Sequence, residues 1–432
     1  MKAPTRTTFI TAAALTLTAA GLLFAGPLNP PAGPVTSTYK TLTEVEPRIA
    51  INLTNTPGDA DSLFKITQRG SYYLTGNITV PASVFWGISI EASGVTLDLN
   101  GFTIDGNAHE VGGIVVSQSG VTIRNGTITR TTASGISTNL FPIGSAGLTI
   151  ENIRVLTVFG SGIPSGGSAG VGTAGIFAGR GAIIRNCYVS DAALGIAAGY
   201  NSNISGCTVE FARQHAFHLQ GGATISDCVA VGTGGLTTES TYFLGAGSTA
   251  VNCIARSNSG AGFATEDECS LQGCSATNNS GHGISTRDGC TVSNCTAVKN
   301  LGSGISVGSG CTVADSIARR NSLDGIVCAS ACLIRGNTSS NNGFDASGAG
   351  IHATGPDNRI ESNNCTYSTR GIDVDAVRNM IMKNTCSLNT TNWDIVAGNV
   401  CLVVQGSTGG AILGNTGGVA TGSTDPNANF SY

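Results

Sequence analysis

NSGHGISTRDGCTVSNCTAVK, residues 279–299, is one of four consecutive stretches that can be written one below another without a gap. The other three are NSGAGFATEDECSLQGCSATN at 258–278, NLGSGISVGSGCTVADSIARR at 300–320 and NSLDGIVCASACLIRGNTSSN at 321–341. Each is 21 residues long, with Asn first, Gly fifth and Cys twelfth. Within each stretch apolar residues alternate with small or polar ones, a period of two that favours strands over helices.

Each repeat contains three short segments of this kind, such as GISTR, CTVSNCT and AVKN, separated by turns. A unit of three short strands cannot bury its inner face alone, so successive units must stack with equivalent positions in register. Equivalent residues then lie about 4.8 Å apart, close enough for Asn to hydrogen-bond to Asn. We predict a parallel β-solenoid whose repeated Asn takes the left-handed conformation of a sharp corner.

The repeat length, the Asn ladder and the strand pattern resemble those of right-handed parallel β-helix proteins of the pectate-lyase-like superfamily. The resemblance implies an all-β fold, a right-handed three-sheet parallel β-helix, over residues 86–404. Counting the repeated strands gives about 14 coils. Residues 35–81 and 405–432 differ in composition, and we expect them to cap the two ends, because an uncovered sheet edge invites aggregation.

The composition restricts the class of protein. Charged residues make up 11% of the chain, hydrophobic residues 41%, and the net charge is -4. This excludes a disordered chain, and without a basic cluster nucleic acid is an unexpected partner. Residues 1–25 contain two cations followed by an uncharged apolar run, the pattern of a signal peptide. We therefore expect a secreted or cell-surface protein with no stable membrane span after cleavage.

Of the 14 cysteines, seven recur in two files with the same period as Asn and Gly, at 253, 274 and 295 and at 269, 290, 311 and 332. In-register neighbours have parallel side chains with Cβ atoms farther apart than a disulfide prefers. Buried, unpaired thiols packed as small apolar groups are the preferred interpretation, with disulfides between coils as the alternative.

One candidate catalytic cluster is Glu266, His282, Arg287 and Asp288, on two adjacent coils of the first sheet. A carboxylate, an imidazole and a guanidinium could act as acid, base and anion clamp. The triplet Gly281-His282-Gly283 also resembles the Gly-His-Gly of polygalacturonases. The alternatives are a surface ion pair between Glu266 and Arg287, and a His282 that is merely a variable residue of the repeat.

A second cluster, predicted to bind substrate, comprises His352, Arg370, Asp373 and Asp375. The GID at residues 371–373 is similar to the aspartate-bearing strand of polygalacturonases. In that family, however, the aspartate coils precede the histidine coil, and here Asp373 follows His282. The carboxylates of this cluster could hold Ca²⁺, and no other cofactor is indicated.

Extra residues recur at one corner of the repeat, at 105–113, 159–175, 232–241 and 342–350. Insertions at one corner project from the same side of a solenoid. They would form a wall beside the first sheet, where the enzymes of the resembled superfamily bind polysaccharide.

Three functional classes follow from the sequence. The first is an exported β-helix that binds a polysaccharide or cell-surface glycan along its first sheet, without evident catalysis. The second is a lyase, epimerase or hydrolase acting on polymers of uronic acids, and the third is a structural or adhesive surface rod. The sequence does not decide whether the chain is an enzyme, because the fold specifies the reaction hardly at all.

Overall fold

The computed structural model describes residues 47–138, 146–158, 173–234, 240–343, 348–406, 411–414 and 425–432. The described residues from Arg48 onward belong to one compact unit, Arg48–Tyr432, and the predicted signal peptide lies outside the described residues. The described residues form strands and turns, with no apolar helix of a length that could cross a lipid bilayer.

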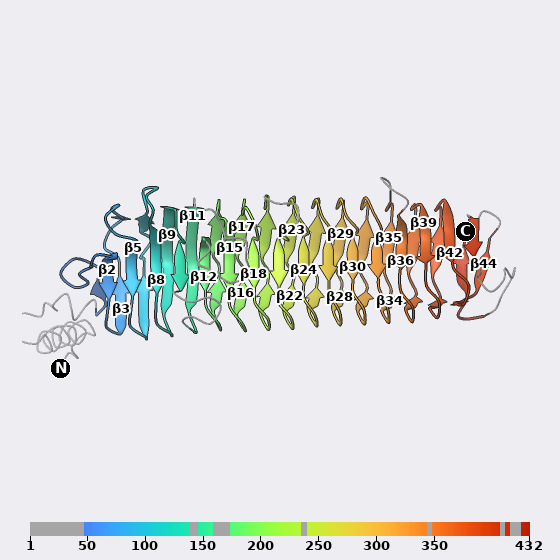
Figure 1. Cartoon of the computed structure of the whole chain (residues 1–432), viewed down its shortest axis with the longest axis horizontal. Helices are drawn as coiled ribbons and strands as arrows, with labels where there is room; N and C mark the ends of the chain where they lie inside the picture. The colour runs from blue at the N-terminus through green and yellow to red at the C-terminus, as the bar shows by residue number, and fades with distance from the viewer. Residues whose placement is uncertain are drawn as a thin grey trace, which may run out of the picture. The chain divides into compact units, whose positions relative to one another are not determined.

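Most coils contribute one strand to each of three parallel stacks, as the sequence predicted (Figure 1). The first stack is sheet B. Its strands are β2 (Ser62–Ile66), β5 (Trp86–Ile90), β8 (Gly112–Val116), β10 (Ile136–Thr138), β12 (Ala174–Ala178), β15 (Leu194–Ala198), β18 (Phe217–Leu219), β21 (Tyr242–Leu244), β24 (Phe263–Thr265), β27 (Ile284–Thr286), β30 (Ile305–Val307), β33 (Ile326–Cys328), β36 (Ala349–Ala353), β39 (Arg370–Val374), β42 (Thr391–Ile395) and β45 (Ala411–Gly414).

The other two stacks form sheet A, because β9 and β11 run through the corner between them without a break. The second stack contains β1 (Ile49–Ala50), β3 (Gly70–Tyr73), β6 (Val95–Asp98), β9 (Thr122–Thr131), β11 (Thr149–Val158), β13 (Ile183–Arg185), β16 (Asn203–Ser205), β19 (Thr224–Ser226), β22 (Thr249–Val251), β25 (Ser270–Gln272), β28 (Thr291–Ser293), β31 (Thr312–Ala314), β34 (Leu333–Arg335), β37 (Arg359–Glu361), β40 (Met380–Met382) and β43 (Val400–Cys401). The third adds β4 (Ile78–Thr79), β7 (Thr103–Asp105), β14 (Tyr188–Ser190), β17 (Thr208–Glu210), β20 (Val229–Val231), β23 (Ile254–Arg256), β26 (Ser275–Thr277), β29 (Thr296–Val298), β32 (Ile317–Arg319), β35 (Thr338–Ser340), β38 (Asn364–Thr366), β41 (Thr385–Ser387), β44 (Val403–Gln405) and β46 (Asn429–Ser431).

Sheet B has 16 strands, two more than the predicted number of coils. The additional strands are β2 and β45, which lie in the segments expected to cap the ends. Both pair in parallel with the next strand of the repeat, β2 with β5 and β45 with β42. Short apolar runs such as SLFKI in residues 62–66 therefore form coils although they do not keep the 21-residue period.

The register of the stacks places like residues over like residues in the core. In sheet B, Ile284 pairs with Ile305 and Ile305 with Ile326, and all three are fully buried. Farther toward the N-terminus, stacked aromatic rings fill the same file: Tyr242 lies between Phe217 and Phe263, with ring centroids 4.8 and 4.5 Å apart. The core is therefore a set of apolar files running along the helix axis.

The predicted Asn ladder lies inside the coil. The side-chain amide of Asn279 donates to Oδ1 of Asn300 at 3.0 Å, and Asn300 donates to Asn321 at 3.0 Å. The predicted left-handed conformation is wrong for these residues, because positive φ falls on the residue before each ladder Asn, such as Asn278 and Lys299. The ladder Asn points inward, and its Oδ1 also accepts the backbone N–H of the preceding rung.

All 14 cysteines are free and buried, which confirms the preferred interpretation of their files. Each thiol of one file takes part in the backbone network: Sγ of Cys290 accepts the N–H of Cys269 at 3.3 Å, and Sγ of Cys311 accepts that of Cys290 at 3.3 Å. These thiols therefore fill a structural role that resembles that of the Asn ladder.

Candidate functional site

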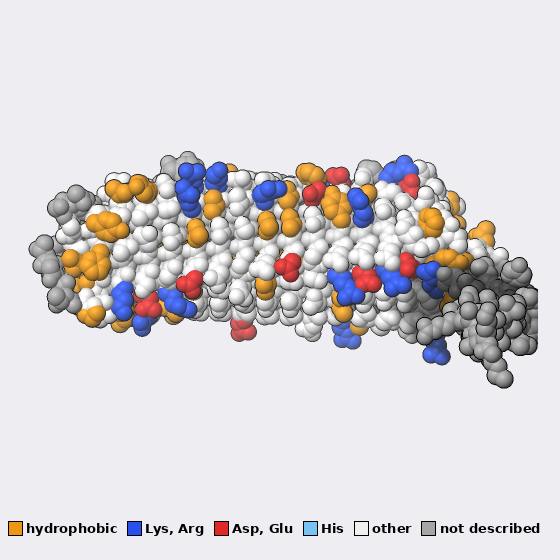
Figure 2. Space-filling model, turned by 180° about the vertical axis from the view of Figure 1, so that it is seen from behind, with side chains coloured by type: hydrophobic (Ala, Val, Ile, Leu, Met, Phe, Trp, Pro, Cys, Tyr) orange, Lys and Arg blue, Asp and Glu red, His pale blue; other side chains and the backbone are white. Residues whose placement is uncertain are grey.

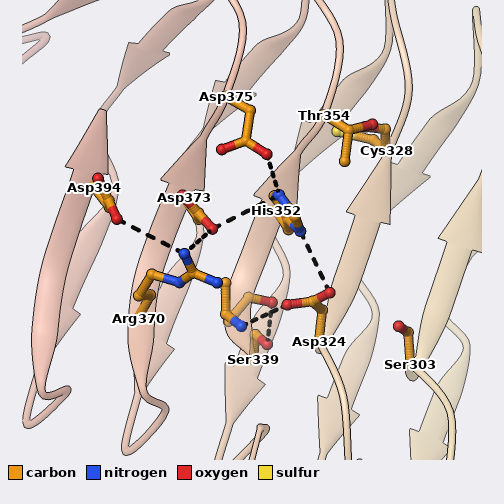
Figure 3. Close-up of polar contacts among 12 residues, drawn as sticks. Ser303, Asp324, Cys328, Ser339, His352, Thr354, Arg370, Asp373, Asp375 and Asp394 are labelled. Atoms are coloured by element: carbon orange, nitrogen blue, oxygen red, sulfur yellow. Dashed lines mark hydrogen bonds and ion pairs between the residues drawn. The ribbon is translucent and has the colours of Figure 1, made fainter. Parts of the chain in front are cut away.

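The outward residues of sheet B form a file in which each residue pairs with its equivalent on the next strand. In its C-terminal part, His352 of β36 pairs with Asp373 of β39, and Asp373 pairs with Asp394 of β42. Arg370 begins β39, and Asp375 directly follows that strand. The structure thus brings together all four predicted substrate-binding residues, which lie on two adjacent coils (Figure 3).

His352 is surrounded by carboxylates on three sides. Its Nε2 lies 2.9 Å from Oδ2 of Asp375 and 3.7 Å from Oδ2 of Asp373, while its Nδ1 lies 3.4 Å from Asp324. The contact with Asp324 is the largest of the effects that raise the pKa of His352 to about 9. The imidazole therefore carries a positive charge at neutral pH, with both ring nitrogens as donors.

Asp373 is the most buried acid of the cluster, with 3% of its side chain exposed. Its Oδ2 lies 2.9 Å from Nη1 of Arg370, yet no N–H or O–H in the described structure points at this oxygen with hydrogen-bond geometry. Burial raises the pKa of Asp373 to about 6, although His352 and Arg370 act in the opposite direction. A buried carboxyl group that changes charge near neutral pH is a feature of functional sites.

Asp324 and Asp394 also belong to this cluster, although the sequence did not lead us to predict them as members. Asp324 precedes β33 and also accepts the N–H of Ala349 at 2.6 Å, and Asp394 lies 3.8 Å from Nη1 of Arg370. The repeat carried a signal for both. Asp394 is 21 residues after Asp373, and Asp324 precedes its repeat Gly as Arg370 does.

A metal ion fits this cluster poorly. One ligand atom each of His352, Asp373 and Asp375 lies within 4.8 Å of the others. Calcium takes six to eight oxygen ligands, and a metal-binding histidine must be neutral, whereas His352 is protonated at neutral pH. Arg370 also lies against Asp373. The arrangement is an ion-pair network, and Ca²⁺ remains a prediction that this geometry does not favour.

The predicted catalytic residues are divided between two corners. His282 precedes β27, whereas Arg287 and Asp288 follow it, so His282 and Arg287 are separated by about 16 Å of extended chain. Glu266 follows β24 at the same end as Arg287, but among the described residues no ion pair joins the two.

His282 and Asp288 both support turns. Nδ1 of His282 accepts the N–H of Ser303 at 3.0 Å, and Oδ1 of Asp288 accepts the N–H of Ser309 at 2.7 Å. Burial lowers the pKa of His282, so its imidazole is neutral and can accept this bond. These hydrogen bonds explain why His282 and Asp288 occupy their positions, without a role in catalysis.

A second feature of the same outward file is an aromatic patch at His218 and Phe243, which pair on β18 and β21. Their rings are stacked with centroids 5.0 Å apart, and His215 lies 5.2 Å from His218. Burial lowers the pKa of His218 to about 4, so its ring is neutral. The patch offers flat, uncharged rings rather than ion-pairing groups.

Between the aromatic patch and the charged cluster, the outward file contains only short side chains. They are Ala264, Ser285, Ser306 and Val327 on β24, β27, β30 and β33. His218 and His352 are six strands apart, which corresponds to about 29 Å along the axis. Figure 2 shows the molecule from behind, where the Lys, Arg, Asp and Glu side chains lie mainly near the two long edges. The predicted wall beside sheet B stays a prediction, because three of its four segments fall partly outside the described residues.

Comparison with known proteins supports the fold. Residues 144–297 and 194–338 match the family model described as a right-handed β-helix region. No curated protein matches the chain. The A-module of a mannuronan C-5 epimerase from Azotobacter vinelandii is 14% identical, with 72% of this chain and 91% of that chain covered and a TM-score of 0.41.

Two other similar structures are those of a polysaccharide lyase and a tailspike protein. A mannuronic-acid-specific family 6 polysaccharide lyase from human gut microbiota is 10% identical, with 76% of this chain and 81% of that chain covered and a TM-score of 0.42. The Dettilon tailspike protein is 13% identical, with 78% and 61% covered and a TM-score of 0.34. A likeness at this level says nothing about the chemistry of the chain.

Proposed function

We propose that this right-handed parallel β-helix of the pectate-lyase-like type binds an extended polysaccharide along the outer face of sheet B. The observation that carries the proposal is the continuous outward file from Phe243 to Asp394, with rings at one end and a charged cluster at the other. An exported location, inferred from residues 1–25, belongs to the same proposal.

The two ends of the file suit different parts of a sugar chain. The rings of His218 and Phe243 can stack on the apolar face of a sugar, because aromatic side chains combine apolar area with low entropy loss. The carboxylates of Asp375 and Asp394 can accept hydrogen bonds from sugar hydroxyl groups, and Arg370 can donate to a hydroxyl or a carboxylate. The short side chains between them leave room for a polymer to lie flat.

A second candidate function is acid–base catalysis at the charged cluster, favoured by the contrast between Asp373 and His352. The pKa of Asp373 is raised to about 6 and that of His352 to about 9, so one group can accept a proton while the other holds one. Neighbouring groups with separated pKa values often divide the roles of base and acid. A lyase or epimerase would use them at a uronic acid, and a hydrolase at the glycosidic oxygen.

The test compares variants on a panel of acidic and neutral polysaccharides. Arg370→Ala should weaken retention on the best polymer by about tenfold, the effect of losing a charge-assisted contact. The matched control is Arg378→Ala, which removes an exposed arginine paired with Asp357 near the same end of the helix. Unchanged retention in Arg370→Ala, or no retention of any polymer by the native protein, would contradict the proposal.

Measurements of reducing ends and of unsaturated-uronate absorbance separate the two candidates. Binding without product supports the binding function. Product formation that is lost in Asp373→Asn, with binding retained, supports the catalytic one.

A further inference from the structure

The corner between the third stack and sheet B carries a cleft of about 780 Å³, outside the site described above. Its lining includes Lys299, Arg320 and Tyr367, which follow β29, β32 and β38, and the exposed Leu301 and Leu388. Among the described residues that line it there are two cations and no carboxylate. The cleft therefore presents positive charge beside apolar surface.

The cleft runs along the axis because its residues occupy equivalent positions on successive coils. The strand ends before them pair in register: Val298 with Arg319, Arg319 with Ser340, and Ser340 with Thr366. One coil therefore separates Lys299 from Arg320, and two coils, about 10 Å, separate Arg320 from Tyr367. A ligand that contacts all three must be elongated.

These side chains are available for binding. Tyr367 is 58% exposed and Leu388 is 61% exposed, although both are large and apolar. Lys299 and Arg320 are also exposed, and in the part of the chain that the structure describes neither of them forms an ion pair. An anion would meet no competing carboxylate from the described lining of the cleft.

The backbone gives an independent reason to single out this corner. Lys299, Arg320, Tyr367 and Leu388 all have left-handed backbone conformations, with φ between 55° and 58°. At the corner within sheet A, the equivalent left-handed positions are mostly Asn, Asp or Gly, and the exceptions are Ser362 and Lys383 on the last two coils. Large side chains are unfavourable in this conformation. The same corner also has Arg130 and Phe211 in this conformation outside the cleft, but only along the cleft do large residues occupy four of five consecutive positions, with Asn341 as the fifth.

We propose that this corner cleft is a second binding site, which takes an elongated acidic saccharide. Lys299 and Arg320 bind carboxylate or sulfate groups of successive sugars, and the ring of Tyr367 packs against a sugar face. The hydroxyl groups of Ser322, Thr369 and Thr390 line the same cleft and suit sugar hydroxyl groups. This site does not depend on the function proposed for sheet B.

The charge test uses polygalacturonate and its fully methyl-esterified form, which has the same backbone without the charge. All proteins carry Arg370→Ala, so that binding at sheet B does not mask the result. The double variant with Lys299→Ala and Arg320→Ala should bind polygalacturonate about tenfold more weakly. Arg319→Ala, which removes an exposed cation next to Arg320 but outside the cleft, should change binding by less than about twofold. Equal losses in the two would overturn the proposal.

The backbone test uses Tyr367→Asn. Asn tolerates the left-handed conformation better than Tyr, as Asn341 does on the preceding coil, so this variant should melt at a higher temperature and bind polygalacturonate more weakly. A lower melting temperature would mean that Tyr367 serves the fold. Unchanged binding, or equally tight binding of poly-glutamate, would show a general anion patch instead of a saccharide site.

Discussion

Removing one rung of the Asn ladder should destabilise the coil more than most single substitutions. Asn300 is fully buried, and its side chain takes part in four hydrogen bonds. Two are donated by the main chain and side chain of Asn279 at 3.1 and 3.0 Å, and two are donated to Ala276 and Asn321 at 3.1 and 3.0 Å. Asn300→Ala removes all four and leaves the donors of Asn279 buried without this partner.

At about 1 kcal/mol for each buried hydrogen bond, the loss amounts to about 4 kcal/mol of unfolding free energy. Because a solenoid is stabilised by contacts between neighbouring coils, the loss should be local. Hydrogen exchange should therefore accelerate most at the amides of residues 276–321, and urea unfolding should begin at a lower concentration. The control Asn203→Ala changes an exposed Asn in β16 and should stay within about 0.5 kcal/mol. If Asn300→Ala shifted stability no more than Asn203→Ala, the ladder would not support the coil as we argue.

Two further predictions concern groups that titrate or react. The pKa of His352 is raised to about 9 by Asp324, Asp375 and Asp373, against the lowering effect of its burial, so its contribution should be complete below about pH 6.5 and should be lost as the pH rises through 9. His352→Gln should flatten that part of a melting-temperature profile, and a profile identical to the native one would contradict the assigned network. The 14 buried thiols should react with a water-soluble thiol reagent almost completely in urea and hardly at all in the native protein, and a low count in urea under non-reducing conditions would indicate disulfides.

Periodicity was sufficient to predict the coil, because each repeated residue type satisfies a requirement of stacking. It could not identify which residue of a corner has positive φ, since neighbouring residues share the same period. The positions of Asn278 and Asn279 both repeat every 21 residues, and only the structure shows that Asn278 takes the left-handed conformation while Asn279 turns inward.

The candidate clusters differ for a geometric reason. His352 and Asp373 occupy the same position on adjacent strands, so counting coils was enough to bring them together. His282 and Arg287 lie on one coil, but at opposite ends of β27. The extended strand separates them by about 16 Å, which is more than the distance across three coils. The burial that raises the pKa of Asp373 also could not be predicted from the sequence, because it depends on how the neighbouring side chains pack.

The constant register of the middle coils has a consequence for how such a molecule can change. From β24 to β33, each coil is interchangeable with the next in its backbone pairing. A duplication or deletion of one 21-residue unit would move the aromatic patch and the charged cluster apart or together by one step of about 4.8 Å, without altering the immediate surroundings of either. The number of repeats therefore sets the distance between the two contact points. Rearrangement of the gene alone could match this distance to the length of a new ligand.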